Sequence, residues 1–288
     1  MRARLCGVLL MAIVALSSPP SSQAWGSPGH RITGYIANSL LTHDARAQLK
    51  ILVGSDDVSL LTTWMDDERE SLERQRPGTS RWHYENRTIC GVFNRDCPRG
   101  DCITEQIERH RAILADVRAS RVERATAVRV LAHLIGDMHQ PLHIADNKDR
   151  GGNDTYVELP REKNARRLHE AWDVSFVKLN VGRRSEANFA HDLIRKHAGA
   201  RASWERGTLD EWAQETYALG KRFGYESLPA FACANSNAPN SPRSNPQGPI
   251  VLSAEYIAAA RSTVETQLAA AGVRLAKVLN EALASDGP

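Results

Sequence analysis

The stretch His133-Leu134-Ile135-Gly136-Asp137-Met138-His139-Gln140-Pro141-Leu142-His143 carries the clearest chemical signal in the chain. His133 and Asp137 are four residues apart in an apolar segment, so on a buried helix both side chains would lie on one face. Pro141 cannot continue that helix and favours an extended Gln140, which predicts His143 in a loop beyond the helix end. Two imidazoles and a carboxylate in an apolar setting are candidate zinc ligands. The alternative is a buried His–Asp hydrogen bond with His143 on the surface.

A second segment, His169-Glu170-Ala171-Trp172-Asp173, repeats the same spacing of imidazole and carboxylate. Buried His and Asp side chains cost free energy unless they are paired or bind a metal, so two such pairs on apolar helices favour a metal site. Three further candidates are His30 near the start of the chain, Asp66 after a tryptophan, and His83 between two aromatic residues. The other histidines lie in polar surroundings and are predicted at the surface: His43, His110, His139, His191 and His197.

Residues 1–24 have the features of a secretory signal peptide. The segment begins with basic residues, continues with an apolar run from Leu5 to Leu16, and ends in the small residues Ser22-Gln23-Ala24. The apolar run is too short to span a bilayer, and no later stretch is apolar enough to do so. We therefore expect an exported protein, secreted or periplasmic, whose mature chain begins at Trp25.

The mature chain would be almost neutral. The whole sequence has 37 Lys and Arg against 34 Asp and Glu, and the signal segment removes two arginines and no acidic residue, which leaves an excess of about one positive charge. Such a balance excludes a protein that coats nucleic acid through bulk charge, so any polyanion must be held locally. Residues 25–288 are enough for one large domain with a sizeable core.

Helical periodicity dominates the mature chain, and Ser253 can cap a long final helix that reaches about residue 284. Thr155–Leu159 is a candidate strand in a small hairpin. The predicted fold class is therefore all-α, a single compact multi-helix domain with at most a small β-hairpin. The other predicted helices are Ile32–Leu41, Ala45–Val53, Leu60–Glu70, Thr104–Asp116, Arg121–Asp137, Arg166–Leu179, Asn188–His197 and Leu209–Phe223.

Four cysteines remain after the signal segment, and an even number in an exported chain favours two disulfides. Cys97 and Cys102 are close enough in sequence to close a small loop, which leaves Cys90 to pair with Cys233. Zinc binding by the four thiolates is the alternative, but the spacing lacks paired C-x-x-C units.

Signal cleavage would also create a chemical group that the precursor lacks. A free α-amine has a pKa near ~8 and loses its proton easily beside a cation. Together with the Trp25 carbonyl it could chelate a metal in a five-membered ring. The alternative is that Trp25 only packs against the core.

In the order in which they occur along the chain, the motifs described above resemble those of the S1/P1 nuclease family. The resemblance implies an α-helical domain of the phospholipase C/P1 nuclease type with three Zn²⁺ ions in a deep cleft. The matching segments are Trp25-Gly26-x-x-Gly29-His30, Trp64-x-Asp66, His83, His133-x3-Asp137-x-x-Gln140-Pro141-Leu142-His143, Gly151-Gly152-Asn153 and Leu168-His169-x-x-Trp172-Asp173.

The same resemblance implies how the ligands divide among three ions. Asp66, His83, His133 and Asp137 would hold one zinc. His143, His169 and Asp173 would hold a second. The Trp25 amine and carbonyl, His30 and a bridging Asp137 would hold the third. Nitrogen and oxygen ligands of this kind suit zinc in a hydrolytic site.

By resemblance, the activity would be cleavage of single-stranded DNA and RNA to 5′-phosphorylated products, with 3′-nucleotidase activity, by attack of metal-activated hydroxide on phosphorus. Mono- and oligonucleotides would also be substrates. The protein would be a monomer, and it would not associate stably with a membrane. Asp66 would orient the attacking water. Arg69 would neutralise the phosphate, although the family more often has Lys there, and a solvated helix charge is the alternative.

Four residues would contact the substrate. Tyr84 would stack on a base, and Asn153 would hydrogen-bond the nucleotide, although both could equally be structural. Asn86 stands where the family often has an acidic residue that contacts the base, so base preference can differ here. Arg150 would lie on the pocket rim.

Two other functions compete. A zinc-dependent phospholipase C would share the fold and a similar ligand set, but His30 follows Trp25 by only five residues, and Asp173 stands where the phospholipases usually have Glu. An exported zinc-sequestering protein without catalysis would bind zinc tightly but offers no reason for open coordination positions.

Overall fold

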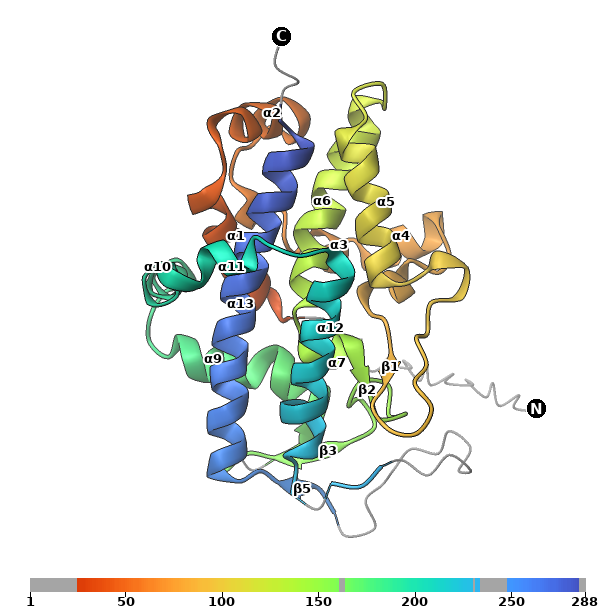
Figure 1. Cartoon of the computed structure of the whole chain (residues 1–288), viewed down its shortest axis with the longest axis vertical. Helices are drawn as coiled ribbons and strands as arrows, with labels where there is room; N and C mark the ends of the chain where they lie inside the picture. The colour runs from red at the N-terminus through yellow and green to blue at the C-terminus, as the bar shows by residue number, and fades with distance from the viewer. Residues whose placement is uncertain (1–24, 161–163, 230, 234–247, 285–288) are drawn as a thin grey trace, which may run out of the picture.

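Three long helices form the frame of the domain in this computed structural model, which describes residues 25–160, 164–229, 231–233 and 248–284. Helix α13 (Ala254–Ala282) runs almost the length of the molecule, beside α1 (Ser27–Leu40) and α6 (Arg121–Met138) (Figure 1). The crossing of α1 and α13 is close because Gly272 has no side chain, and a Cβ there would lie 2.4 Å from Cβ of Ile36. Small residues on α13 thus allow close packing.

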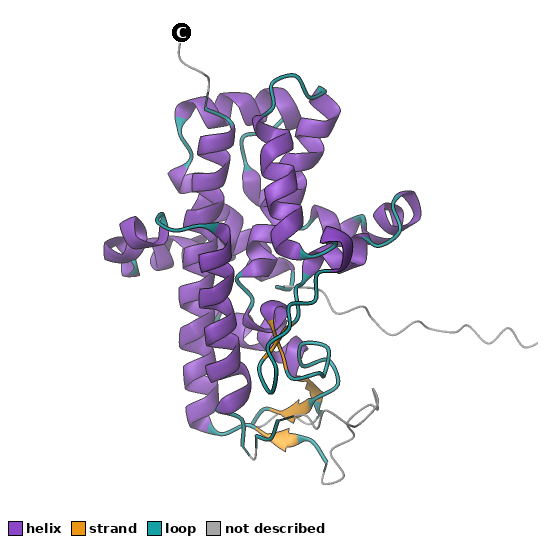
Figure 2. Cartoon of the chain, turned by 45° about the vertical axis from the view of Figure 1, so that its right-hand side comes forward, coloured by secondary structure: helices purple, strands orange, loops and turns teal. Residues whose placement is uncertain are grey.

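Helix starts follow the capping residues in the sequence. Ser253 accepts a hydrogen bond from the Tyr256 amide at the start of α13. Ser120 and Glu123 form a reciprocal capping box at the start of α6. The predicted all-α class is confirmed, and Figure 2 shows how little strand the domain contains. The remaining helices of eight or more residues are α2 (His43–Val53), α5 (Ile103–Ala115), α10 (Glu186–Lys196) and α12 (Leu209–Leu219).

The predicted helix Leu60–Glu70 is wrong as a single element. A 3-10 turn covers Val58–Leu60, and helices α3 (Trp64–Asp67) and α4 (Arg69–Gln75) follow. The break frees the Thr62 carbonyl, which accepts a hydrogen bond from Nδ1 of His133 at 2.7 Å. Backbone irregularity therefore supplies a partner for a buried imidazole.

The predicted helix Arg166–Leu179 also differs in detail. It begins as strand β4 (Arg166–Arg167) and helix α8 (Leu168–Glu170), continues as a π-helical turn over Ala171–Ser175, and ends as α9 (Phe176–Val181). The Phe176 amide donates to the Ala171 carbonyl five residues back. Such π-turns are frequent at functional sites because they change the direction of nearby side chains. Asp173 lies in this turn.

Short helices complete the connections. His143 lies in helix α7 (Pro141–Ile144) and not in a loop as predicted, because Gln140 caps a new helical turn that begins at Pro141. A second π-helical segment, Gly220–Glu226, follows α12 where the sequence predicts continuous α-helix. The other short helices are Thr79–His83, Pro98–Gly100, Ala198–Ala200 and α11 (Arg201–Trp204).

Strands are brief and lie in the lower half of the domain as drawn in Figure 2. The predicted hairpin is present as β3 (Tyr156–Glu158), which pairs antiparallel with β4 and parallel with β5 (Ile250–Val251). A separate parallel pair joins β1 (Arg87–Thr88) to β2 (Ala145–Asp146), with Arg87 opposite Ala145. This pair fixes the chain after His83 beside the chain after His143.

Two disulfides cross-link the described part of the chain. Cys90 bonds to Cys233, and Cys97 bonds to Cys102, the pairing expected from sequence spacing. The signal peptide predicted at residues 1–24 lies outside the described residues. Among the residues the structure describes, no helix has the length and apolar character needed to cross a membrane.

Candidate metal centre and substrate cavity

The first cluster lies at the C-terminal half of α6. Oδ2 of Asp137 is 2.9 Å from Nδ1 of His83 and 3.1 Å from Nε2 of His133, and these two nitrogens are 3.0 Å apart. Three donor atoms at the corners of such a triangle match the edges of a tetrahedron with zinc–ligand bonds of about 2.0–2.1 Å, which are roughly 3.3 Å long. Oδ1 of Asp66 is 3.9 Å from the same His133 nitrogen.

His30 faces the other oxygen of the same carboxylate. Its Nε2 is 3.1 Å from Oδ1 of Asp137, and its ring stacks on His133 with centroids 4.1 Å apart. Both His30 nitrogens and Oδ1 of Asp137 are buried without a hydrogen-bond partner in the described part of the chain. Unsatisfied buried polar atoms are costly, so this group fits a bound cation.

A second cluster joins His143 on α7 to His169 and Asp173. The two Nε2 atoms are 3.1 Å apart, and Oδ2 of Asp173 is 3.3 Å from Nε2 of His169. Nδ1 of His143 donates to the His83 carbonyl at 2.6 Å, and Nδ1 of His169 donates to the Gly151 carbonyl at 2.5 Å. These bonds fix the tautomer of each neutral ring and leave a lone pair on each Nε2.

Burial also determines the charge of these two rings. It lowers the pKa of His143 to about 3 and that of His169 to about 4, so both rings are neutral at physiological pH. Two nitrogen lone pairs then point at each other at hydrogen-bond distance with no proton between them. A divalent cation between them removes the repulsion, so the donor set fits a metal ion.

Charge in the first cluster is distributed differently. Burial would lower the pKa of His133, but the carboxylates of Asp137 and Asp66 raise it to about 9. Burial would raise the pKa of Asp137, but the imidazoles around it hold the pKa well below its usual value. Without metal, this cluster therefore holds an imidazolium–carboxylate pair, and a bound cation would replace the proton.

Asp66 has a cationic neighbour of its own. Arg69, one turn further along the chain, donates from Nη2 to Oδ1 of Asp66 at 2.9 Å. Burial would raise the pKa of Asp66, but the imidazoles of His133 and His30 hold it below the usual range. The carboxylate is therefore ionised.

Trp25 lies against the second cluster. Its side chain is fully buried, and the Gly26 amide donates to the Asp173 carbonyl at 3.0 Å. The beginning of the described chain is thus held by backbone bonding to the π-turn that carries Asp173.

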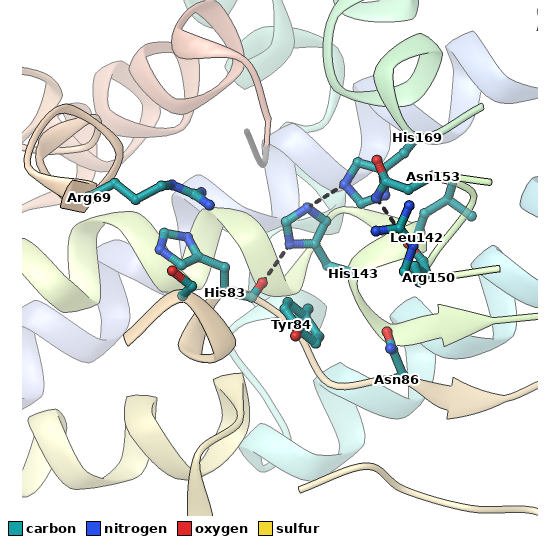
Figure 3. A pocket seen from close by; sticks show the side chains of 10 residues that line it. Arg69, His83, Tyr84, Asn86, Leu142, His143, Arg150, Asn153 and His169 are labelled. Carbon is teal, nitrogen blue, oxygen red and sulfur yellow. Dashed lines mark hydrogen bonds between the residues drawn. The ribbon is translucent and has the colours of Figure 1, made fainter. Parts of the chain in front are cut away.

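A cavity of about 270 Å³ opens over these clusters (Figure 3). It brings His83, His143 and His169 together with all the substrate-binding candidates from the sequence and with Arg69, whose side chain reaches toward the imidazoles. Its lining residues are Arg69, Ser80, His83, Tyr84, Asn86, Leu142, His143, Arg150, Asn153 and His169.

Asn153 has a defined orientation in the cavity wall. Its Nδ2 donates to the Arg150 carbonyl at 2.9 Å, and its Oδ1 is buried without a partner among the described residues. Arg150 has φ of 57°, and its guanidinium pairs with Asp154 at 2.5 Å. Asn153 therefore lines the cavity with an amide oxygen that has no partner among the described residues.

Two buried carboxylates, which the sequence analysis missed, organise this wall. Asp146 accepts from the Gly151 amide at 2.7 Å, and Asp149 accepts from the Gly152 amide at 2.8 Å and from the Tyr225 hydroxyl at 2.7 Å. Gly151 has φ of 63°, and a Cβ there would lie 2.3 Å from the Leu142 carbonyl oxygen. The Asp-x-x-Asp spacing before a Gly-Gly pair was the available sequence signal.

Two histidines predicted at the surface are buried. His139 is fully buried, and its Nε2 faces Arg274 of α13 at 3.0 Å, whereas His110 packs against Trp82. Their local sequence is polar, but their partners come from distant segments. His43, by contrast, is exposed as predicted.

Glu85 is another buried carboxylate that the sequence motifs did not identify. It is fully buried and accepts hydrogen bonds from Arg87 and Arg95, both at 2.8 Å, and from Thr104. These bonds hold the chain between His83 and β1, so Glu85 sets the position of the cavity wall that carries Tyr84 and Asn86.

An α-helical domain with imidazoles and carboxylates gathered below a polar cavity is typical of metal-dependent hydrolases. A sequence profile described as "S1/P1 Nuclease" matches residues 25–284, so the chain belongs to the S1/P1 nuclease family. It is therefore a hydrolase of a family that acts on nucleic acids.

Individual relatives support the assignment over most of the chain. Endonuclease 1 of Arabidopsis thaliana is 25% identical over 312 residues, which cover 97% of this chain and 93% of that protein. Nuclease P1 of Penicillium citrinum is 26% identical over 89% of this chain and 97% of its own length. Nuclease S1 of Aspergillus oryzae is 27% identical over 61% of this chain and 62% of its own length.

Proposed function

We propose that the protein is a zinc-dependent phosphodiesterase that cleaves single-stranded DNA and RNA to 5′-phosphorylated products and that also acts as a 3′-nucleotidase. The observation that carries the proposal is the pair of Nε2 atoms of His143 and His169, which face each other 3.1 Å apart at the cavity wall. A cation held there would lie within reach of a phosphate bound in the same cavity.

Three ions account for the buried donors. His83, His133, Asp66 and Asp137 would hold one zinc, and His143, His169 and Asp173 a second. His30, the second oxygen of Asp137, and the Trp25 amine and carbonyl would hold the third. The set contains only nitrogen and oxygen donors, as expected for zinc in a hydrolytic site. Bound zinc would supply the Lewis acidity that polarises a phosphoryl oxygen and activates water.

The chain's own residues would bind and orient the substrate. Arg69 would pair with a non-bridging phosphate oxygen, and Asp66 would orient the attacking water. Hydrolysis forms a bond from the water oxygen to phosphorus and breaks the bond to the 3′-oxygen, which leaves as a hydroxyl with one proton. The phosphate keeps its bond to the 5′-oxygen of the next nucleotide.

Substrate choice would follow from the cavity wall. The Tyr84 ring would stack on an unpaired base, which any sequence can offer once the strand is single. Oδ1 of Asn153 would accept a hydrogen bond from the nucleotide, and the Asn86 amide would contact the base edge. Arg150 would lie on the rim, near the phosphate backbone. A duplex hides its base faces in the stack and would be a poorer substrate.

Elemental analysis with a digestion assay tests this proposal. We expect three zinc ions per mature chain, cleavage of single-stranded DNA and RNA, and loss of cleavage after chelation that zinc restores. Zinc binding without phosphodiester cleavage would point to a sequestering protein. Preferential hydrolysis of short-chain phosphatidylcholine would point to a phospholipase. Either result would overturn the proposal.

The N-terminal amine needs a separate experiment. We propose that residues 1–24 form a signal peptide removed during export and that cleavage before Trp25 exposes the ligand. A chain with two extra residues before Trp25 should fold, bind two zinc ions and lose most activity. Removal of the extra residues by a site-specific protease should restore the third ion and the activity. Full activity of the extended chain would exclude the amine as a ligand.

A further inference from the structure

Gln140 is a buried residue whose two amide ends have different partners. The side chain is fully buried in the chain between α6 and α7. Its Oε1 accepts from the Leu142 amide at 2.5 Å and so caps α7, which carries His143. Its Nε2 donates to Oδ1 of Asp173 at 2.5 Å. One side chain therefore connects the two segments that form the second cluster.

The backbone of the same residue links the two clusters. The Gln140 amide donates to the Asp137 carbonyl at 2.9 Å, and its carbonyl accepts from the His143 amide at 2.9 Å. Its extended conformation, with φ of −83° and ψ of 116°, follows from Pro141. The position of the amide relative to the cluster is therefore set by the backbone.

Each donor group of the second cluster has a fixed partner on the side away from the cluster. His143 and His169 use backbone carbonyls for this purpose. Asp173 uses the Gln140 amide, which occupies Oδ1 and leaves Oδ2 facing Nε2 of His169. A carboxylate without this bond could rotate, since its two oxygens are otherwise equivalent.

The hydrogen-bond partners of Asp66 and Asp173 also differ in charge. Asp66 in the first cluster is held by a guanidinium, which draws negative charge away from the site. The Gln140 amide is neutral, so it orients Asp173 without adding a positive charge that would compete with a bound cation. Partners of this kind commonly contribute 10- to 100-fold to metal affinity.

We propose that Gln140 is a positioning residue of the second metal cluster, which directs Oδ2 of Asp173 at the cation through a hydrogen bond to Oδ1. This role rests on the proposed metal site. It is separate from the capping of α7, because the two functions use opposite ends of the amide.

Two substitutions separate these functions. Gln140→Glu keeps the volume and the acceptor for the Leu142 amide but replaces the donor to Asp173 with a carboxylate. Gln140→Met removes both hydrogen bonds at similar volume. A matched control is Gln267→Glu, which changes another buried glutamine, whose side chain donates to Thr216 on α12.

Zinc affinity is measured by competition with a chelating dye, and the number of ions retained is measured by elemental analysis after dialysis. Both Gln140 variants should bind one of the zinc ions about 10- to 100-fold more weakly than the wild type. They should retain the other ions, and a His143→Gln reference variant should do the same. Cobalt(II) substitution should show a changed absorption spectrum, and Gln267→Glu should match the wild type in both measurements.

The melting temperature of the metal-free variants separates folding from metal binding, and Gln140→Glu should still fold but melt below the wild type, because it buries a second carboxylate beside Asp173. Weakened zinc binding in Gln140→Met alone would assign Gln140 to capping and overturn the proposal, as would wild-type affinity in both variants. A wild-type protein that binds no zinc at the second cluster would overturn the proposed function and this role together.

Discussion

His139 and His143 are two buried histidines, four residues apart, and they differ in the kind of group that faces Nε2. In each ring Nδ1 donates to a backbone carbonyl, that of Ile135 at 2.7 Å for His139 and that of His83 at 2.6 Å for His143. Burial lowers the pKa of both to about 3. Nε2 of His139 faces the guanidinium of Arg274 at 3.0 Å, whereas Nε2 of His143 faces another imidazole nitrogen at 3.1 Å.

This difference separates a structural histidine from a candidate ligand. Arg274 carries only donors, so it satisfies the lone pair of His139, and it also pairs with Glu215. His169 offers His143 a second lone pair. Neither burial nor a lowered pKa distinguishes the two rings. The atom opposite Nε2 does, because only the second arrangement needs a cation.

The largest expected effect comes from the same substitution at both positions. His143→Gln should lower kcat/KM on single-stranded DNA about 1,000-fold, because the Lewis acidity supplied by the metal is worth several kcal/mol. His139→Gln should stay within a few-fold of the wild type and retain all bound zinc. If both variants lost the same amount of zinc, the assignment of His143 as a ligand and His139 as a structural residue would be wrong.

Arg69 tests whether a cation in the cavity wall acts on substrate. Arg69→Met should lower kcat/KM about 10- to 100-fold, because a charge-assisted hydrogen bond contributes roughly 1.5–3 kcal/mol. Arg69→Lys should recover part of the loss. Arg74→Met, on the exposed side of α4, is the control. If Arg69→Met and Arg74→Met behave alike, Arg69 has no role in binding phosphate.

The pH dependence of the free energy of unfolding tests the structural role of His139. The pKa of His139 is about 3 in the fold and 6.5 when unfolded. The unfolded chain therefore binds the proton first, and stability is lost as pH falls below 6.5. At pH 5 this amounts to about 2 kcal/mol, or roughly 30-fold in the folding equilibrium.

Urea denaturation at pH 7 and pH 5 measures that loss. His139→Gln should lose about 2 kcal/mol less than the wild type between these two pH values. The exposed His43→Gln should show the wild-type loss. If His139→Gln lost as much stability as the wild type between pH 7 and pH 5, protonation of His139 would not be the cause of the loss.

The smallest expected effect lies at the rim of the cavity. Tyr84→Leu should raise KM for single-stranded DNA about 10-fold with little change in kcat, since one stacked base contributes roughly 1–3 kcal/mol. Tyr84→Phe should keep the wild-type KM. An exposed tyrosine on β3 provides the control Tyr156→Leu. A fall in kcat rather than a rise in KM would contradict a stacking role.

Local sequence was sufficient for the helical class and the disulfide pairing, and the resemblance to the S1/P1 nucleases implied the grouping of His83, His133, His143 and His169. Spacing within a helix fixes which side chains share a face, and the motifs lie within short segments. It was not sufficient for His139, because its burial depends on Arg274, 135 residues further along the chain. The π-turn at Asp173 and the break before Trp64 likewise depend on contacts that periodicity does not encode.

The Cys90–Cys233 disulfide closes a covalent ring of chain with a separation of 143 residues. Segments that carry His133, Asp137, His143, His169 and Asp173 all lie inside this ring. A single proteolytic cut between the two cysteines would therefore leave both pieces joined, with every one of these side chains still attached to the same molecule. A cut inside the ring thus gives a nicked chain whose two pieces stay connected.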